Sequence, residues 1–205
     1  MSAVAKAAHV WERDGLDWYV EERRCTSGLL TVERFVGAVW DPSCGGGNIV
    51  EEMLAAGVDA VGTDIKQRVQ RWWFRGERDF LAFEGQPLAQ NIVMNPPFFR
   101  AKGAEAFIRK ALSLATGKVV AFVDIKFLAG GARAQGLYAD LPPTRVWVIS
   151  PRPSCPPGEY LANGGKAEGG TADWCWLVWD LTAPRAETQI RWLRCTSTSS
   201  EAEEA

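Results

Sequence analysis

The chain has 205 residues, and its 47% hydrophobic and 23% charged residues lie close to the averages of globular proteins. This composition excludes wholesale disorder, and the length accommodates one domain with a sizeable core. The formal net charge of −2 becomes +1 when the three tail residues Glu201, Glu203 and Glu204 are left out. Charge therefore neither excludes nor favours a nucleic-acid partner.

The N-terminal segment has no long apolar core and carries Glu12, Arg13 and Asp14, so it does not resemble a signal peptide. Apolar runs such as Val119–Val123 are far shorter than the roughly 20 residues of a membrane-spanning helix. We expect a cytoplasmic protein with no membrane partner. One domain is expected over residues 1–195, followed by a disordered acidic tail over residues 196–205.

Cysteine and histidine usage narrows the possible chemistry. The five cysteines are odd in number and widely spaced, with no CxxC pair, which argues against a disulfide framework and against a structural zinc site. The single histidine, His9, lies near the N-terminus, so histidine metal sites and Ser–His–Asp triads are not expected. We predict a site that works without imidazole and without a metal ion.

Short apolar runs alternate with helical patterns along the chain, after an N-terminal leader and helix over residues 1–35, with the helix near Thr26–Phe35. The expected strands are Val36–Trp40, Asp59–Thr63, Asn91–Met94, Lys118–Val123, Arg145–Ile149 and Trp174–Trp179. The expected helices are about Asn48–Ala56, Lys102–Ala115 and Phe127–Tyr138. This alternation predicts an α/β fold with a mostly parallel sheet and helices on both of its faces.

A glycine-rich turn, DPSCGGGN over residues 41–48, follows the first expected strand and opens a helix. Such a turn lets a ligand approach the backbone closely, and the helix start favours an anionic group. Asp41 ends the first strand, and Asp64 ends the second, where a carboxylate can accept both hydroxyls of a ribose. The turn lacks the GxGxxG spacing of dinucleotide-binding dehydrogenases, but taken alone it leaves a nicotinamide cofactor possible.

The tetrapeptide Asn95-Pro-Pro-Phe98 follows another expected strand, Asn91–Met94. Its two prolines make the loop rigid and hold Asn95 in extended geometry. The Asn95 side-chain oxygen and the Pro96 carbonyl are then two acceptors suited to a planar NH2 group, while Phe98 offers a flat face for the ring that carries it. This pattern favours methyl transfer to such an amine, driven by proximity and orientation.

These motifs, DPSCGGGN (41–48), GTDI (62–65), Asp79-Phe80 and NPPF (95–98), resemble in order and spacing those of class I S-adenosylmethionine-dependent amino-methyltransferases. The resemblance covers about residues 17–180 and is greatest to the small DNA adenine-N6 methyltransferases of phages and prophages. It implies a Rossmann-like, seven-stranded sheet with an antiparallel last strand, S-adenosylmethionine as cofactor, and a bacterial or phage-infected host cell. Larger members carry a separate target-recognition region for which this chain has no spare length.

The resemblance also implies roles for individual residues. Asn95, Pro96, Pro97 and Phe98 correspond to the catalytic loop. The implied cofactor contacts are Tyr19, Asp41, Pro42, Ser43, Gly45, Gly47, Asn48, Asp64, Ile65, Asp79, Phe80 and Asn95. Trp18 and Glu21 lie, with Tyr19, where such enzymes contact the methionine part of the cofactor. Candidate substrate contacts are Phe98, Phe99, Lys102 and Arg152.

The sequence therefore predicts methylation of the N6 amine of adenine in DNA, with the base flipped out of a double strand. The same NPPF loop would also serve cytosine N4, RNA adenine or a glutamine amide in a protein. A catalytically silent nucleic-acid-binding module is an alternative of a different class. Specificity would come from the loops Lys66–Arg78, Leu128–Pro143 and Ser150–Gly170, the first of which mixes basic and aromatic side chains. It would then be short and relaxed, unless a partner supplies it.

Overall fold

The computed structural model describes residues 15–99, 102–167, 170, 172–183 and 187–195. The first part of the expected leader, with His9, lies outside the described residues, and so does the expected acidic tail over 196–205. No helix within the described ranges is long and apolar enough to cross a membrane.

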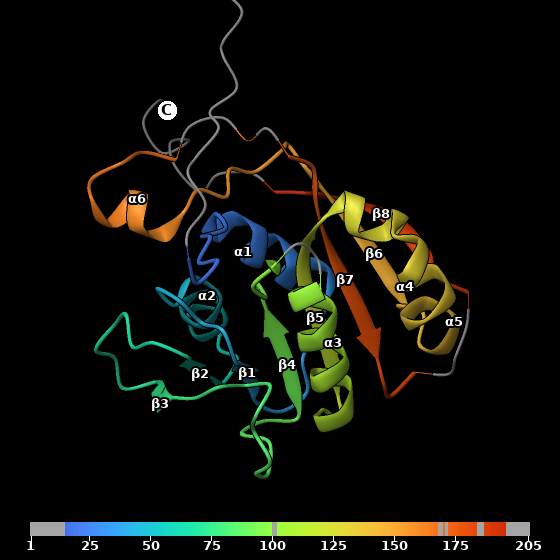
Figure 1. Cartoon of the computed structure of the whole chain (residues 1–205), viewed down its shortest axis with the longest axis horizontal. Coiled ribbons are helices and arrows are strands. Elements are labelled where there is room, and N and C mark those ends of the chain that lie inside the picture. The colour runs from blue at the N-terminus through green and yellow to red at the C-terminus, as the bar shows by residue number, and fades with distance from the viewer. Residues whose placement is uncertain (1–14, 100–101, 168–169, 171, 184–186, 196–205) are drawn as a thin grey trace, which may run out of the picture.

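Helices and strands alternate along the described chain (Figure 1). The strands are β1 (Val39–Asp41), β2 (Ala60–Asp64), β3 (Phe74–Glu77), β4 (Asn91–Met94), β5 (Lys118–Asp124), β6 (Arg145–Ser150), β7 (Trp174–Asp180) and β8 (Gln189–Arg194). The α-helices are α1 (Arg23–Val32), α2 (Asn48–Ala55), α3 (Lys102–Leu114), α4 (Gly131–Gln135), α5 (Leu137–Asp140) and α6 (Gly158–Ala162). A 3-10 helix, Ile125–Ala129, connects β5 to α4.

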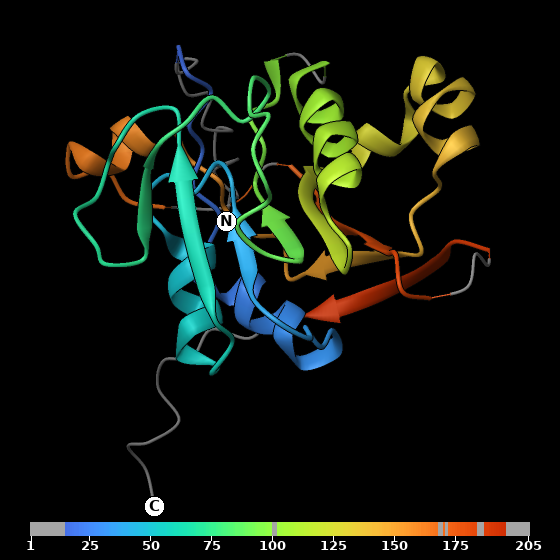
Figure 2. The ribbon, with the colours of Figure 1, turned by 90° about the horizontal axis from the view of Figure 1, so that it is seen from below.

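The strands form one sheet in the order β3-β2-β1-β4-β5-β7-β6-β8. The first five strands of this order run parallel to one another, whereas β7 lies antiparallel between β5 and β6. β8 pairs with β6 in parallel and forms one edge of the sheet. Figure 2 shows the sheet between two layers of helices, with α1 and α2 on one side and α3 to α5 on the other.

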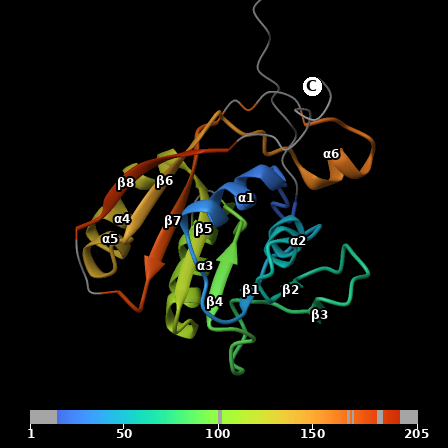
Figure 3. The same cartoon turned by 180° about the vertical axis from the view of Figure 1, so that it is seen from behind.

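Alternating side chains of the central strands build a hydrophobic core on each face of the sheet, because successive residues of a strand point to opposite faces. On β5, Val120 and Phe122 join the core beneath α1 and α2, which Figure 3 shows from that side. Val119 and Ala121 join the core beneath α3 and α5. Both faces of β5 and β7 are therefore buried, as the continuous apolar runs of these segments indicate.

The predicted α/β fold with helices on both faces is confirmed. The resemblance implies an antiparallel last strand, whereas the antiparallel strand is β7, and β8 follows it and pairs with β6 in parallel. The sheet of the described residues has eight strands instead of the seven implied by the resemblance. The two unpredicted strands lie at the edges: β3 falls in the expected Lys66–Arg78 loop, and β8 follows the antiparallel strand. Their side chains are largely exposed, so neither segment has the apolar pattern of a buried strand.

Two predicted helices differ from the structure. The helix expected over Phe127–Tyr138 is divided into the 3-10 helix, α4 and α5, with Gly130 and Gly136 at the breaks. The helix expected near Thr26–Phe35 begins earlier and ends at Val32, because Glu33 takes up extended geometry. The Glu33 side chain is thereby turned into a buried ion-pair cluster with Lys118 and Arg145.

Candidate active site

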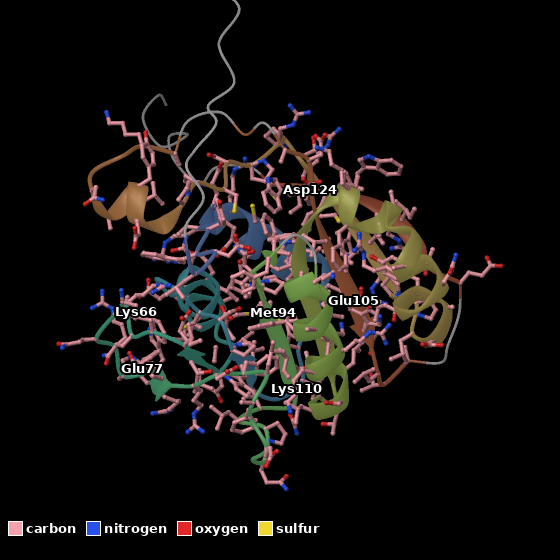
Figure 4. All side chains as sticks on the ribbon, in the orientation of Figure 1. Lys66, Glu77, Met94, Glu105, Lys110 and Asp124 are labelled. Atoms are coloured by element: carbon pink, nitrogen blue, oxygen red, sulfur yellow. The ribbon has the colours of Figure 1, made fainter. Side chains whose placement is uncertain are left out.

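A cavity of about 260 Å³ lies where the parallel strands β1, β2 and β4 end. Carboxyl ends of parallel strands meet at one edge of the sheet, which is the usual place for a ligand in such folds. Figure 4 labels two residues at these strand ends, Met94 on β4 and Lys66 just after β2. The predicted site residues that line the cavity are Tyr19, Asp41, Pro42, Ser43, Gly45, Asn48, Asp64, Ile65, Asp79, Phe80, Asn95, Pro97 and Phe99.

Other predicted site residues lie outside the lining. Gly47 has a positive φ of 92° at the start of α2, and an added Cβ there would lie 2.3 Å from the Trp73 ring. Its role is therefore to let the turn pack closely against Trp73. The Phe98 ring packs edge-on against Trp174 with centroids 5.9 Å apart, whereas the neighbouring Phe99 borders the cavity. The structure thus brings the second phenylalanine of the loop, and not the first, to the cavity wall.

Three more of the predicted site residues, Lys102, Arg152 and Pro96, do not line the cavity. Lys102 begins α3 and is exposed. Arg152 pairs with Asp173 at 2.8 Å, with both side chains about half exposed. Pro96 belongs to the NPPF loop, where its fixed φ sets the direction of the chain.

The two strand-end aspartates organise the glycine turn through backbone hydrogen bonds. Asp64 accepts from the Gly45 N–H at 2.8 Å and from the Lys66 N–H at 3.1 Å. Asp41 accepts from the Ser43 N–H at 3.0 Å. Gly45 has a φ of 51°, and an added Cβ there would lie 2.6 Å from Trp18 Nε1. This position therefore requires glycine.

The Asn95 side chain is held in one orientation. Its Nδ2 donates to the Tyr19 carbonyl at 2.9 Å and to Glu21 Oε2 at 2.8 Å. Because the Tyr19 carbonyl and an ionised Glu21 carboxylate only accept hydrogen bonds, the amide presents its nitrogen to them and its oxygen is left for another donor. The Ser43 hydroxyl donates to the Asn95 carbonyl at 3.2 Å and so ties the NPPF loop to the glycine turn.

The cavity is rich in acidic groups. The carboxyl side chains among its lining residues are Asp17, Glu21, Asp41, Asp64 and Asp79. Burial raises the pKa of Glu21 to about 7, against smaller opposing effects of hydrogen bonds to its backbone and Asn95 and of the Arg23 charge. Burial also raises the pKa of Asp41 well above its usual value, and the nearby Glu21 and Asp64 charges add to this effect. Such a lining suits a ligand with cationic and hydroxyl groups.

Two arginines border the same cavity. The Arg68 guanidinium lies 4.3 Å from the centroid of the Trp18 ring, a cation–π contact. The Arg78 guanidinium lies 5.6 Å from the centroid of the Phe83 ring. The Nε atoms of both arginines are buried, with no hydrogen-bond partner among the described residues. These ring contacts orient the two side chains where they line the cavity.

Some of the basic and aromatic side chains of Lys66–Arg78 are buried or paired in the structure, and others are exposed. Trp73 is buried against the glycine turn, whereas Trp72 is 69% exposed. Arg71 pairs with Glu51 of α2 at 3.3 Å. Only part of this segment therefore presents free basic and aromatic groups to a partner.

Asp17 is a site residue that the sequence does not predict. Its Oδ2 accepts from the Phe99 N–H at 2.6 Å, and both residues have positive φ, 56° for Asp17 and 36° for Phe99. This contact joins the N-terminal segment to the end of the NPPF loop across 82 positions of sequence. Aspartate tolerates this backbone region better than most residues, but that preference does not indicate the distant partner.

No protein-family model and no curated protein sequence matches the chain. Among solved structures, the modification subunit of a candidate type I restriction enzyme from Vibrio vulnificus YJ016 is similar, with TM-score 0.59 and 14% identity over 90% of this chain and 48% of that one. A candidate class I S-adenosylmethionine-dependent methyltransferase from Listeria monocytogenes gives TM-score 0.55 and 14% identity, and the match covers 82% of this chain and 64% of that one. A candidate RNA methyltransferase from Pyrococcus horikoshii gives TM-score 0.55 and 14% identity, and the match covers 76% of this chain and 79% of that one.

These similarities show that the chain has the Rossmann-like fold of class I methyltransferases. The chain spans 64% of the Listeria protein and 48% of the Vibrio subunit. Within the described ranges, no three histidine, cysteine, aspartate or glutamate side chains are grouped so that they could hold a metal ion.

Proposed function

We propose that the protein is an S-adenosylmethionine-dependent methyltransferase that acts on the N6 amine of adenine in DNA, with its activity in one domain over residues 1–195. The orientation of the Asn95 amide is the observation that carries this proposal. Its nitrogen donates to Tyr19 and Glu21, which leaves its oxygen as an acceptor on a residue that lines the cavity.

The residues of the cavity fit S-adenosylmethionine. When bound, this cofactor supplies a methyl group activated on a cationic sulfonium. Asp64 would accept the ribose hydroxyls, since its oxygens each keep a second lone pair beyond the Gly45 and Lys66 contacts. The Asp41 carboxyl would face the cationic end of the cofactor, whose charge favours the ionised form of this buried group, and Ile65 and Phe80 would border the adenine. Gly46 leaves open space within the turn, since an added Cβ would meet no heavy atom within 4 Å.

The NPPF loop supplies the substrate side of the site. The Asn95 side-chain oxygen and the Pro96 carbonyl would each accept one N–H of a planar amine, which aims the nitrogen lone pair at the methyl group. Phe99, which is 47% exposed at the cavity wall, offers a face for the ring that carries the amine. An adenine stacked in a duplex does not reach such a recess, so the base would be flipped out of the strand.

Two observations favour a nucleic acid over other carriers of a planar amine. Trp72, 69% exposed in the basic segment Lys66–Arg78, offers an aromatic face on which a base could stack. Structures that share the fold include the modification subunit of a candidate type I restriction enzyme and a candidate RNA methyltransferase. The same amine-binding loop would equally accept cytosine N4, RNA adenine or a glutamine amide, so these are the competing substrates.

Transfer of tritium from labelled S-adenosylmethionine to a panel of substrates tests the proposal. The panel is unmodified double-stranded DNA, total RNA and a glutamine-containing peptide, with digestion of each product to nucleosides or amino acids. We expect label in N6-methyladenine from DNA. Label confined to RNA or to glutamine would show that RNA or protein, and not DNA, is the substrate. Cofactor binding without transfer to any member would indicate a nucleic-acid-binding module without catalysis.

A further inference from the structure

Glu21 lies between the N-terminal segment and the NPPF loop, and it is fixed at both its backbone and its side chain. Its side-chain Oε2 accepts from Asn95 Nδ2 at 2.8 Å, and its backbone carbonyl accepts from Asn48 Nδ2 at 2.8 Å. Asn48 is the first residue of α2, directly after the glycine turn. Glu21 is only 5% exposed, so the carboxylate cannot reorient into solvent.

The chemical type of Glu21 determines which way the Asn95 amide faces. A side-chain amide can present either its nitrogen or its oxygen to a neighbour, and an ionised carboxylate accepts hydrogen bonds only. The Tyr19 carbonyl, 2.9 Å from the same Nδ2, is likewise only an acceptor. The two groups therefore take both N–H bonds of the amide and keep its oxygen away from themselves.

We propose that Glu21 is a positioning residue for methyl transfer, whose carboxylate holds the Asn95 nitrogen so that the Asn95 oxygen is presented to the substrate amine. This role rests on the proposed function, in which that oxygen accepts an N–H of the amine. Burying a carboxylate costs free energy unless hydrogen bonds compensate for the lost hydration. Here the carboxylate fixes a hydrogen-bond acceptor of the site.

The ionisation of Glu21 makes this role dependent on pH. The groups that face its carboxylate are the Asp41 carboxyl, the Arg23 guanidinium and the thiols of Cys25 and Cys155. Burial, the largest effect, raises the pKa of Glu21 to about 7, while its hydrogen bonds and Arg23 oppose this rise. Below this pH a protonated carboxyl donates a hydrogen bond and competes for the Asn95 oxygen. Turnover should therefore increase as pH rises through about 7.

A nuclear magnetic resonance titration tests the contact independently of activity. The side-chain NH2 signals of Asn95, assigned by their loss in Asn95→Ala, are followed from pH 6 to 8.5 in the wild type, Glu21→Gln and Glu21→Leu. We expect the wild-type signals to titrate, the Glu21→Gln signals to be independent of pH, and the Glu21→Leu signals to move toward the positions of a solvent-exposed amide. Signals that coincide in all three proteins would overturn the contact.

Steady-state kinetics of the same variants tests the role in turnover. We expect Glu21→Leu to lower kcat about tenfold to a hundredfold with the cofactor Kd changed only a few-fold, because one N–H of Asn95 is left unsatisfied. Glu21→Gln, whose oxygen can still accept, should recover most of that loss and remove the pH dependence around 7. The exposed control Glu159→Gln should match the wild type in rate and in the Asn95 signals.

The outcomes separate the two proposals. A wild type that transfers no methyl group to any substrate overturns the proposed function and, with it, the role of Glu21, even if the Asn95 signals titrate. An active wild type in which Glu21→Leu keeps its kcat overturns the role of Glu21 alone. An unchanged kcat with a weakened cofactor Kd would assign Glu21 to cofactor binding and likewise overturn positioning.

Discussion

Replacing Asn95 with alanine is expected to lower turnover about a thousandfold or more, while the affinity for the cofactor changes only a few-fold. The change removes the side-chain oxygen that orients the amine. Losing this orientation and the polar stabilisation of the reacting group raises the activation barrier enough to lower the rate by such a factor. The backbone carbonyl of Asn95 and its bond from the Ser43 hydroxyl remain. Methyl transfer to DNA and calorimetric titration with S-adenosylmethionine measure the two quantities.

The control for this variant is Asn163→Ala, which truncates an exposed asparagine at the end of α6. It should leave both turnover and cofactor affinity at wild-type values. Asn95→Ala also removes the contacts to Tyr19 and Glu21, so its thermal unfolding should be measured alongside. Retained turnover would contradict the assigned role of the amide, and a lost cofactor affinity at an unchanged melting temperature would mean that the loop serves the cofactor instead.

Replacing Glu33 with leucine is expected to lower the free energy of unfolding by about 3–5 kcal/mol, which corresponds to roughly 6–20 °C in Tm for a domain of this size. Glu33 is 3% exposed, and its carboxylate accepts from Arg145 Nε and Lys118 Nζ, each at 2.5 Å, and from Trp147 Nε1 at 2.9 Å. Leucine removes the common acceptor and leaves the buried Trp147 Nε1 without a partner, while Arg145 and Lys118 keep Asp180 at 3.1 Å and 3.7 Å. Differential scanning calorimetry gives the change.

The effect of Glu33 should also depend on pH. Burial alone would raise the pKa of Glu33, but the hydrogen bonds from Arg145, Lys118 and Trp147 outweigh it and hold the pKa below the ordinary value of 4.5. The stability that Glu33 contributes is therefore fully present above pH 4.5 and is lost as the pH falls through the lower folded-state value. Asp173→Ala, which breaks the exposed pair with Arg152, should cost at most about 1 kcal/mol. Equal effects of the two variants at pH 7 would contradict this account.

The elements that hold the site could be predicted because their sequences carry local patterns. The glycine turn after β1 and the NPPF loop after β4 each follow a short apolar strand, and parallel pairing brings the two strand ends together. The edge strand β8 could not be predicted in the same way, since Ile190 and Trp192 are exposed instead of buried. Its pairing with β6 depends on the edge that the sheet offers and not on an apolar pattern.

The contacts of the N-terminal segment were the least predictable part of the site. Glu21 and Asp17 reach Asn95 and Phe99 across 74 and 82 positions, and nothing local in the sequence indicates these pairings. The choice between Phe98 and Phe99 at the cavity wall depends on the positive φ of Phe99, which the Asp17 contact accompanies. Adjacent identical residues give no sequence pattern by which to make this choice.

Binding of S-adenosylmethionine in the cavity is the central claim, and a calorimetric titration of three proteins tests it directly. Gly46→Leu places a side chain into the open space of the turn, where an added Cβ meets no heavy atom within 4 Å and the backbone does not require glycine. Gly131→Leu, at an equally open glycine at the start of α4, is the matched control. We predict one bound cofactor per chain for the wild type and the control, and binding at least about tenfold weaker for Gly46→Leu, because the leucine occupies the cavity. No binding by the wild type, or equal affinity in all three proteins, would contradict the account.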